Sequence, residues 1–293
     1  MKSRAKATRA KAKPPAKRAA PAKKKAAVKK PAATKAKEAA KSDAATPPTP
    51  QARKRAADIE VRLSHAMPQP ICELDHQNAW QLLIATILSA QSTDRMVNKV
   101  TPALFATYPT PAVLGAADQA EVEVAVKSTG FFRNKAKAIR AASQQIAERF
   151  GGEVPRDIDA LMTLPGVARK TANVVLGTAY RIPSGMTIDT HATRVAQRLA
   201  LTRHEDPVKI ERELCALFET ESWIDMGHRF VLHGRYVCLA KKPRCSDCPL
   251  NELCDARETK PEHTWQTRAT REGERIAARD LGTGTGAALA ASA

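Results

Sequence analysis

The first 57 residues of this 293-residue chain contain no Leu, Ile, Phe or Tyr and consist mainly of Lys, Ala and Pro. Such a segment cannot bury enough apolar surface to offset the entropy lost on ordering, so residues 1–57 are predicted to be a disordered tail. Nineteen Lys and Arg stand there against only Glu38 and Asp43, a net charge of +17. Residues 58–293 carry 29 basic and 28 acidic groups, so the basic character of the chain belongs to this tail.

The tail has two interpretations. It suits non-specific, salt-sensitive contact with DNA or RNA, because each phosphate that it neutralises releases counterions. A solubilising extension would have the same composition. Both interpretations stay open at this point.

Long apolar runs are missing as well. No run could span a bilayer, and no apolar segment of a secretory signal follows the N-terminal charges. We therefore expect a soluble, intracellular protein. Strand-type alternation is also absent, so the fold is predicted to be all-α. The most apolar stretch, Gln77 to Ala90, fits a central buried helix, whereas apolar periodicity fades after Glu258 and residues 258–293 are predicted to be disordered.

A helix–turn–helix pattern begins at Ile158 and ends at Tyr180, with Pro165-Gly166 at the turn. Glycine permits the positive φ of a tight turn, and the amides at the start of the second helix suit a phosphate. Lys170 lies in the first turn of that helix, where the helix dipole favours the neutral amine of a nucleophile. A nucleophilic lysine needs a proton acceptor, and Asp189 is a candidate if the fold brings it close.

Four cysteines near the C-terminus form the most specific pattern in the chain. Cys238, Cys245, Cys248 and Cys254 have the spacing C-x6-C-x2-C-x5-C. An intracellular context argues against disulfides, so the four thiols are predicted to bind zinc or an iron–sulfur cluster. The ligand types alone leave both options open.

The segment Leu164-Pro-Gly-Val-Ala-Arg-Lys-Thr-Ala, followed by Ile188-Asp-Thr-His, resembles the signature of the endonuclease III family. Members of this family are DNA-repair glycosylases with an associated abasic-site lyase activity. The likeness covers about residues 58–257 and implies that Lys170 is the attacking amine, assisted by Asp189. Ala168 stands where the family usually has a second glycine, which would weaken DNA binding if that position required a positive φ or a close approach of the phosphate.

The resemblance also implies a set of DNA-binding residues. Gln91 would fill the space left by a flipped base, and Phe131 would act as a wedge between bases. Helix capping and core packing are the alternative roles of these two loops. The expected DNA contacts are Gln91, Phe131, Gly166, Val167, Ala168, Lys241, Lys242 and Arg244.

A two-lobed helix-hairpin-helix glycosylase fold is implied in turn. Residues 72–183 would form a helical-barrel lobe, and residues 58–71 with 184–257 a lobe that holds a 4Fe–4S cluster on the four cysteines. The implied enzyme is a monomer in a bacterial-type cytoplasm, associated with the nucleoid. It would remove oxidised pyrimidines from double-stranded DNA and cleave abasic sites by β-elimination through a lysine Schiff base.

Three other functions share parts of these patterns. An adenine-mismatch glycosylase has the same fold and cluster, but it usually lacks a lysine at the position of Lys170 and has a further C-terminal domain. An architectural DNA-binding protein would explain the tail but needs no cluster. A redox iron–sulfur protein would explain the cysteines but not the hairpin.

Overall fold

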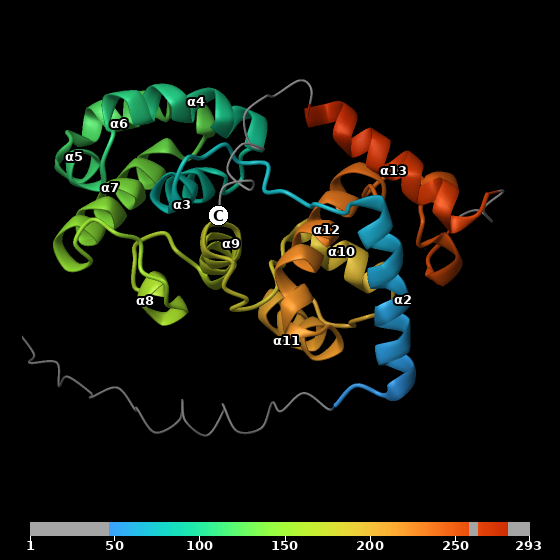
Figure 1. The fold of residues 1–293 in the computed structure, drawn as a ribbon. Coiled ribbons are helices and arrows are strands. Elements are labelled where there is room, and N and C mark those ends of the chain that lie inside the picture. The colour runs from blue at the N-terminus through green and yellow to red at the C-terminus, as the bar shows by residue number, and fades with distance from the viewer. Residues whose placement is uncertain (1–46, 258–262, 281–293) are drawn as a thin grey trace, which may run out of the picture. The chain divides into compact units, whose positions relative to one another are not determined.

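The computed structural model describes residues 47–257 and 263–280, and every regular element in these ranges is helical (Figure 1). The all-α prediction is therefore confirmed. In chain order the elements are α2 (Pro50–Ala66), α3 (Ala79–Leu88), α4 (Asp94–Thr107), α5 (Pro111–Ala116), α6 (Gln119–Ala125), η1 (Lys127–Thr129), α7 (Phe132–Arg149), α8 (Ile158–Met162), α9 (Arg169–Tyr180), α10 (Thr190–Arg198), α11 (Pro207–Leu217), η2 (Thr220–Ser222), α12 (Trp223–Tyr236), η3 (Cys245–Asp247), η4 (Asn251–Leu253) and α13 (Trp265–Asp280).

Helix α3 lies at the centre of a first hydrophobic cluster, which is built by α3 to α9 from residues between Leu74 and Leu176. Every residue from Trp80 to Leu88 is buried, as the uninterrupted apolar run predicts. The buried Trp80 indole donates a hydrogen bond to the Ser143 hydroxyl at 3.0 Å. Neither α3 nor any other helix within the described ranges has the length and apolarity needed to cross a membrane.

A second hydrophobic cluster is built by α2, α10, α11, α12 and the cysteine loop. Its fully buried members include Ile59 and Leu63 of α2 and Phe230 of α12. Helix α2 thus packs with elements that follow it by more than a hundred residues. The chain therefore builds two separate cores, with α3 to α9 around one and α2 with α10 to α12 around the other.

The predicted boundary of the basic tail is wrong by eight residues. Helix α2 begins at Pro50, where the proline occupies the first turn and the Thr49 hydroxyl accepts a hydrogen bond from a backbone amide. Ala56 is fully buried, so this part of the basic segment packs against the folded body. The remaining expectation of disorder, for residues 1–46, lies outside the described residues.

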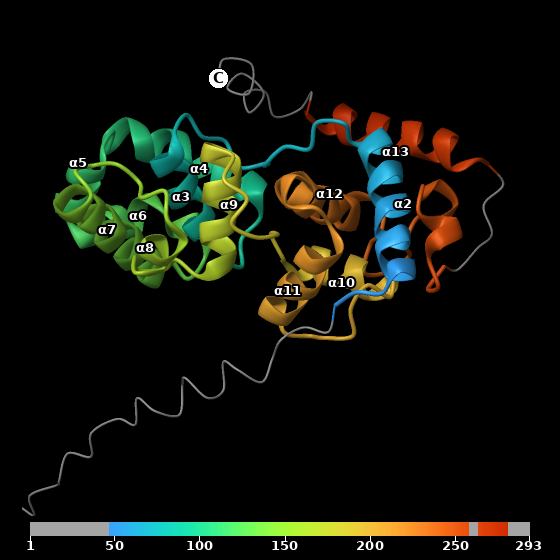
Figure 2. The ribbon, with the colours of Figure 1, turned by 60° about the horizontal axis from the view of Figure 1, so that its bottom comes forward.

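The prediction of disorder after Glu258 is wrong for residues 265–280, which form α13. Figures 1 and 2 show this helix beside α2. Two of its buried residues are charged, Arg268 and Glu272, and a scan for apolar periodicity does not count them. Residues 258–262 and 281–293 lie outside the described ranges.

Candidate active site

The turn between α8 and α9 has the geometry that the sequence pattern predicts. The Val167 amide donates to the Leu164 carbonyl at 3.1 Å and closes the turn. Gly166 has a φ of +80°, and a Cβ atom there would lie 3.0 Å from the Ala138 side chain. Glycine is therefore required at this position by both conformation and space.

Ala168 precedes α9 in an extended conformation, with φ −94° and ψ 168°. An alanine adopts these angles without strain, so the penalty that a positive φ would have caused does not arise. Among the described residues, no side chain caps α9, and both Gly166 and Ala168 are exposed. Val167, in contrast, is buried in the first hydrophobic cluster, so its side chain is not available for DNA.

Lys170 is the second residue of α9 and is partly buried. Within the described part of the chain its ammonium group forms no hydrogen bond or ion pair. Its positive charge acts on two groups from different parts of the chain, the partly buried Cys72 and the buried His228. Burial raises the pKa of Cys72 to about 11, which Lys170 opposes, and burial lowers the pKa of His228 to about 4, an effect to which Lys170 adds.

His228 was not identified from the sequence. It lies on α12, and its Nε2 atom is 3.2 Å from the Thr178 hydroxyl of α9. With its pKa lowered to about 4 by burial, the ring is neutral at physiological pH. Next to it, Ile224 of α12 packs against Gly177 of α9, where an added Cβ would lie 3.3 Å away. The lysine-bearing helix is therefore held directly against α12.

Asp189 caps α10. Its Oδ1 atom accepts hydrogen bonds from the amides of His191 and Ala192, both at 2.8 Å. Among the described residues, Lys170 and Asp189 form no ion pair, and no hydrogen bond to Oδ2 is found. The capping bonds hold the carboxylate in place and leave one of its oxygens available.

A buried polar network fixes the connection between α9 and α10. Arg169 donates from Nε to both oxygens of Glu211, at 3.0 and 2.9 Å, and this bond raises the pKa of Arg169. Asn173 donates to the same carboxylate at 3.0 Å and accepts from the Ser184 hydroxyl at 2.9 Å. Gly185 packs so closely that a Cβ atom would lie 2.1 Å from Glu211. This network, which sequence analysis missed, holds the two residues that flank Lys170 on α9 and the segment that leads to Asp189.

Gln91 and Phe131 share an unusual backbone conformation. Gln91 has a φ of +52° and Phe131 a φ of +48°, both in the left-handed region that residues with side chains seldom adopt. Both side chains are exposed, and Phe131 is 65% exposed. Strained conformations of this kind gather at functional sites, and here they present a polar and an aromatic side chain to the outside.

The turn that presents Phe131 is supported from inside. Lys135 is buried, and its ammonium group donates to the Thr129 carbonyl at 2.7 Å, directly before Gly130. Burial lowers the pKa of Lys135. Lys135 is therefore an internal support of this turn and not an exposed basic residue.

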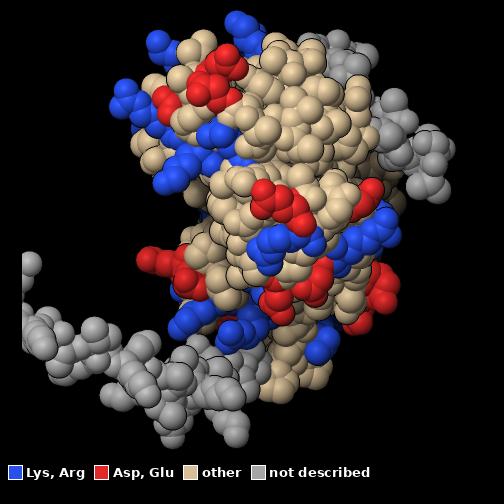
Figure 3. All heavy atoms as spheres, turned by 90° about the vertical axis from the view of Figure 1, so that its left-hand side faces the viewer, with Lys and Arg blue, Asp and Glu red and all other residues tan. Residues whose placement is uncertain are grey.

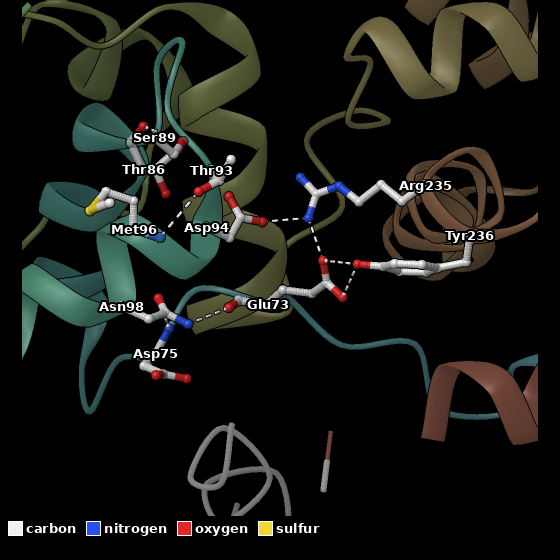
Figure 4. Close-up of polar contacts among 10 residues, drawn as sticks. All are labelled: Glu73, Asp75, Thr86, Ser89, Thr93, Asp94, Met96, Asn98, Arg235 and Tyr236. Carbon is white, nitrogen blue, oxygen red and sulfur yellow. Dashed lines mark hydrogen bonds and ion pairs between the residues drawn. The ribbon is translucent and has the colours of Figure 1, made fainter. Parts of the chain in front are cut away.

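Arg235 of α12 connects the two hydrophobic clusters (Figure 4). Its guanidinium group donates to the carboxylates of Glu73 and Asp94. Tyr236 also donates to Glu73, with both distances at 3.0 Å. Asp94 begins α4, immediately after the loop that carries Gln91, so Arg235 anchors that loop to α12.

The four cysteines of the C-x6-C-x2-C-x5-C pattern line one cavity, together with Arg198 and His233. Cys248 is buried and the other three are partly buried. Arg198 donates to the sulfur of Cys238 at 3.3 Å and to the Leu239 carbonyl at 2.7 Å. Four thiols around one cavity, with hydrogen-bond donors directed at sulfur, suit an iron–sulfur cluster. Cys72 and Cys215 do not line this cavity.

The loop between Cys238 and Cys245 carries exposed basic side chains, namely Lys241, Lys242 and Arg244. Elsewhere, on the face that Figure 3 shows, basic and acidic side chains are interspersed. On that face the basic groups are local and do not form one broad surface, in line with the near balance of charges after residue 57.

Comparison with known proteins agrees with this geometry. Residues 84–220 match the family model of the HhH-GPD superfamily base excision DNA repair protein, and residues 238–254 match that of the iron-sulfur binding domain of endonuclease III. Endonuclease III of Synechocystis sp. is 52% identical over 202 residues, which are 69% of this chain and 92% of that relative. Endonuclease III of Bacillus subtilis is 45% identical over 66% of this chain and 88% of that relative.

Among solved structures, a trapped endonuclease III–DNA covalent intermediate matches with a TM-score of 0.67 and 41% identity. The match covers 70% of this chain and 97% of that one. Fold and site thus define a helix-hairpin-helix base-excision repair enzyme, a DNA glycosylase with abasic-site lyase activity. The chain belongs to the endonuclease III family, whose role is the repair of oxidised pyrimidines, and it holds a 4Fe–4S cluster.

Proposed function

We propose that Lys170 is the nucleophile with which this enzyme excises oxidised pyrimidines and then nicks the DNA at the resulting abasic site. One observation carries the proposal. Lys170 is partly buried and has no ion-pair partner among the described residues, and it lies in the first turn of α9, just after the exposed residues Gly166 and Ala168. An amine that no carboxylate engages is available to attack carbon.

In this proposal the enzyme binds the DNA backbone at two places, the start of α9 and the basic loop. The amides at the start of α9 bind a phosphate, since no side chain in the described residues caps that helix. The basic loop with Lys241, Lys242 and Arg244 binds the backbone farther along. Phe131 enters the stack of bases as a wedge, and Gln91 takes the space of the damaged base once it has flipped out.

The neutral amine of Lys170 attacks C1′ of the deoxyribose while the bond from C1′ to the base breaks. The departing base takes up a proton. The sugar ring opens to give a protonated Schiff base, loss of a proton from C2′ breaks the bond to the 3′ phosphate, and hydrolysis then releases the lysine. Asp189 accepts the ammonium proton or stabilises the positive charge on the sugar.

The 4Fe–4S cluster supplies a covalent anchor for the loop that binds the DNA backbone. Its ligands in this proposal are Cys238, Cys245, Cys248 and Cys254, which line one cavity. No step of the reaction passes through it. The enzyme acts as a monomer on chromosomal DNA of the bacterial cytoplasm, and the basic tail adds non-specific contact with nucleic acid.

Borohydride trapping on a duplex with one abasic site tests the nucleophile. Wild type and Lys137→Ala, which removes an exposed lysine of α7, should form the covalent adduct, and Lys170→Ala should not. An adduct of wild-type yield from Lys170→Ala would overturn the proposal. Failure of cluster-loaded wild type to form any adduct would also remove the lyase mechanism.

Asp189→Asn tests the second role separately from folding. Asparagine is as good a helix cap as aspartate, so the bonds to the amides of His191 and Ala192 can be kept while the charge is lost. Unfolding should then change little, but adduct formation should slow by about a hundredfold, the usual effect of removing a general base. Adduct formation at the wild-type rate would limit Asp189 to a capping role.

A further inference from the structure

Helix α13 follows the cysteine loop and contacts the turn between Cys245 and Cys248, the second and third cysteines of that loop. Arg268 is fully buried and is the largest of the fully buried side chains in the described part of the molecule. Its Nε atom donates to the backbone carbonyl of Cys248 at 2.9 Å, and its Nη2 atom donates to Glu252 at 2.6 Å. A charged donor thus holds the main chain of a cluster ligand directly.

Two more arginines of α13 hold the same turn. Arg275 forms an ion pair of 2.6 Å with Asp247, and Arg271 lies 3.9 Å from the other oxygen of that carboxylate. Arg268, Arg271 and Arg275 follow one another at spacings of three and four residues, so they lie on one face of the helix. Asp247 and Cys248 are neighbours, and this face therefore holds the turn at two consecutive residues.

Glu272 acts on the cysteine side chain through His233. The Nδ1 atom of His233 is 2.7 Å from the fully buried carboxylate, and its Nε2 atom is 3.6 Å from the sulfur of Cys248. Because a carboxylate accepts, Nδ1 carries the proton, and the ring is oriented with Nε2 toward the sulfur. Such outer partners orient the ligands of metal centres.

These charges are a poor way to stabilise helix packing alone. Within the described ranges, Nη1 of Arg268 and Oε2 of Glu272 are buried without a hydrogen-bond partner. Apolar residues of similar volume would pack α13 at a lower cost of desolvation. The placement of both residues on Cys248 indicates a role in positioning that ligand.

Helix α13 is also anchored on α2. Trp265 packs against His65 with ring centroids 5.2 Å apart, and the Arg62 guanidinium lies 5.5 Å from the tryptophan ring. Gly273 allows close approach, since a Cβ atom there would lie 2.7 Å from the Ala66 carbonyl. The helix is thus fixed between α2 and the cysteine loop.

Both family models end before this helix, at residues 220 and 254. We propose that α13 is a clamp that holds the Cys245–Cys248 turn and slows the loss of the iron–sulfur cluster. Loss of the cluster requires this turn to move away, and the clamp opposes that movement at the carbonyl, at Asp247 and at the sulfur. The proposal rests on the cluster and not on the identity of the nucleophile.

The test follows the cluster in the full-length holoprotein by its visible absorbance during exposure to air, with far-UV circular dichroism on the same samples. Arg268→Met should lose the cluster about tenfold faster, as expected for one charge-assisted hydrogen bond, while its helix content stays at the wild-type level. Glu274→Gln, an exposed change on another face of the same helix, should behave as wild type.

Gly273→Ala separates the clamp from helix stability. Alanine is the better helix former, so it would slow cluster loss if only the helicity of α13 mattered. The clamp predicts faster loss, because the methyl group pushes α13 away from α2. Wild-type loss rates in folded Arg268→Met, or slower loss in Gly273→Ala, would overturn the proposal. Lys170→Ala should lose its cluster at the wild-type rate, so this proposal can fail or hold independently of the nucleophile.

Discussion

Replacing Arg235 by methionine should destabilise the enzyme more than the same replacement of an exposed arginine does. The side chain of Arg235 is 24% exposed, and the carboxylates that it joins, those of Glu73 and Asp94, are 7% and 15% exposed. Burial alone would lower the pKa of Arg235, but the two carboxylates raise it, which shows how strongly they favour its charge. Methionine keeps most of the apolar stem and removes only the bridge.

The loss should be about 3 kcal/mol, the lower end for removing one partner of a buried ion pair. The lower end applies because the Tyr236 hydroxyl still donates to Glu73 at 3.0 Å and because water reaches part of the site. For a folded part of this size, each kcal/mol lowers Tm by about 2–4 °C, so Tm should fall by about 6–12 °C.

The assay is thermal unfolding of the cluster-loaded protein at one fixed heating rate. Arg133→Met is the matched control, since the Arg133 side chain is 81% exposed and its distance to Glu123 is 3.9 Å. The control should change stability by less than about 0.5 kcal/mol. Equal Tm values for the two variants would refute the view that Arg235 bridges the two cores.

Three further predictions concern other parts of the molecule. Glu211→Gln should lower the free energy of unfolding in urea by about 1–2 kcal/mol and slow adduct formation, because Arg169 loses its ion pair and the connection to α10 loosens. An unchanged rate of borohydride trapping would show that this network does not affect the reaction. Burial raises the pKa of Cys72 to about 11 and of Cys215 to about 12, so iodoacetamide at about pH 8 should label these thiols only after unfolding. Peptide mass spectrometry measures the labelling, and rapid labelling of the native protein would contradict the prediction. Deleting residues 1–46, which contain sixteen Lys and Arg, should flatten the salt dependence of DNA binding and leave the single-turnover trapping rate unchanged. If the variant and the wild type showed the same salt dependence, the tail would not contact DNA.

Local patterns in the sequence predict much of the site. Pro165-Gly166 predicts the turn before Lys170, because only glycine tolerates the φ of +80° that the structure has there. The cysteine spacing predicts one ligand set, and the four thiols do line one cavity. The central buried helix follows from an apolar run that no exposed helix could carry. In each case the signal lies within some twenty residues, where spacing and backbone chemistry are sufficient.

What the sequence did not reveal depends on partners that are far apart in the chain. Arg235 joins two carboxylates that precede it by more than a hundred residues, and Arg268 and Glu272 make α13 a buried helix although both are charged. Charged residues usually lie on solvent-exposed faces, so a sequence pattern predicts that they are exposed unless an opposite charge or a carbonyl partner is known from the structure.

The sequence by itself therefore determined the all-α fold, the glycine turn, the candidate nucleophile and the cysteine set, because these depend on local chemistry. The tertiary structure decided which charges are buried, that Lys135 supports the Phe131 turn and that α13 closes over the cysteine loop. The physical reason is that a charge can be buried only where folding supplies its partner, and no neighbouring residue in the sequence identifies that partner.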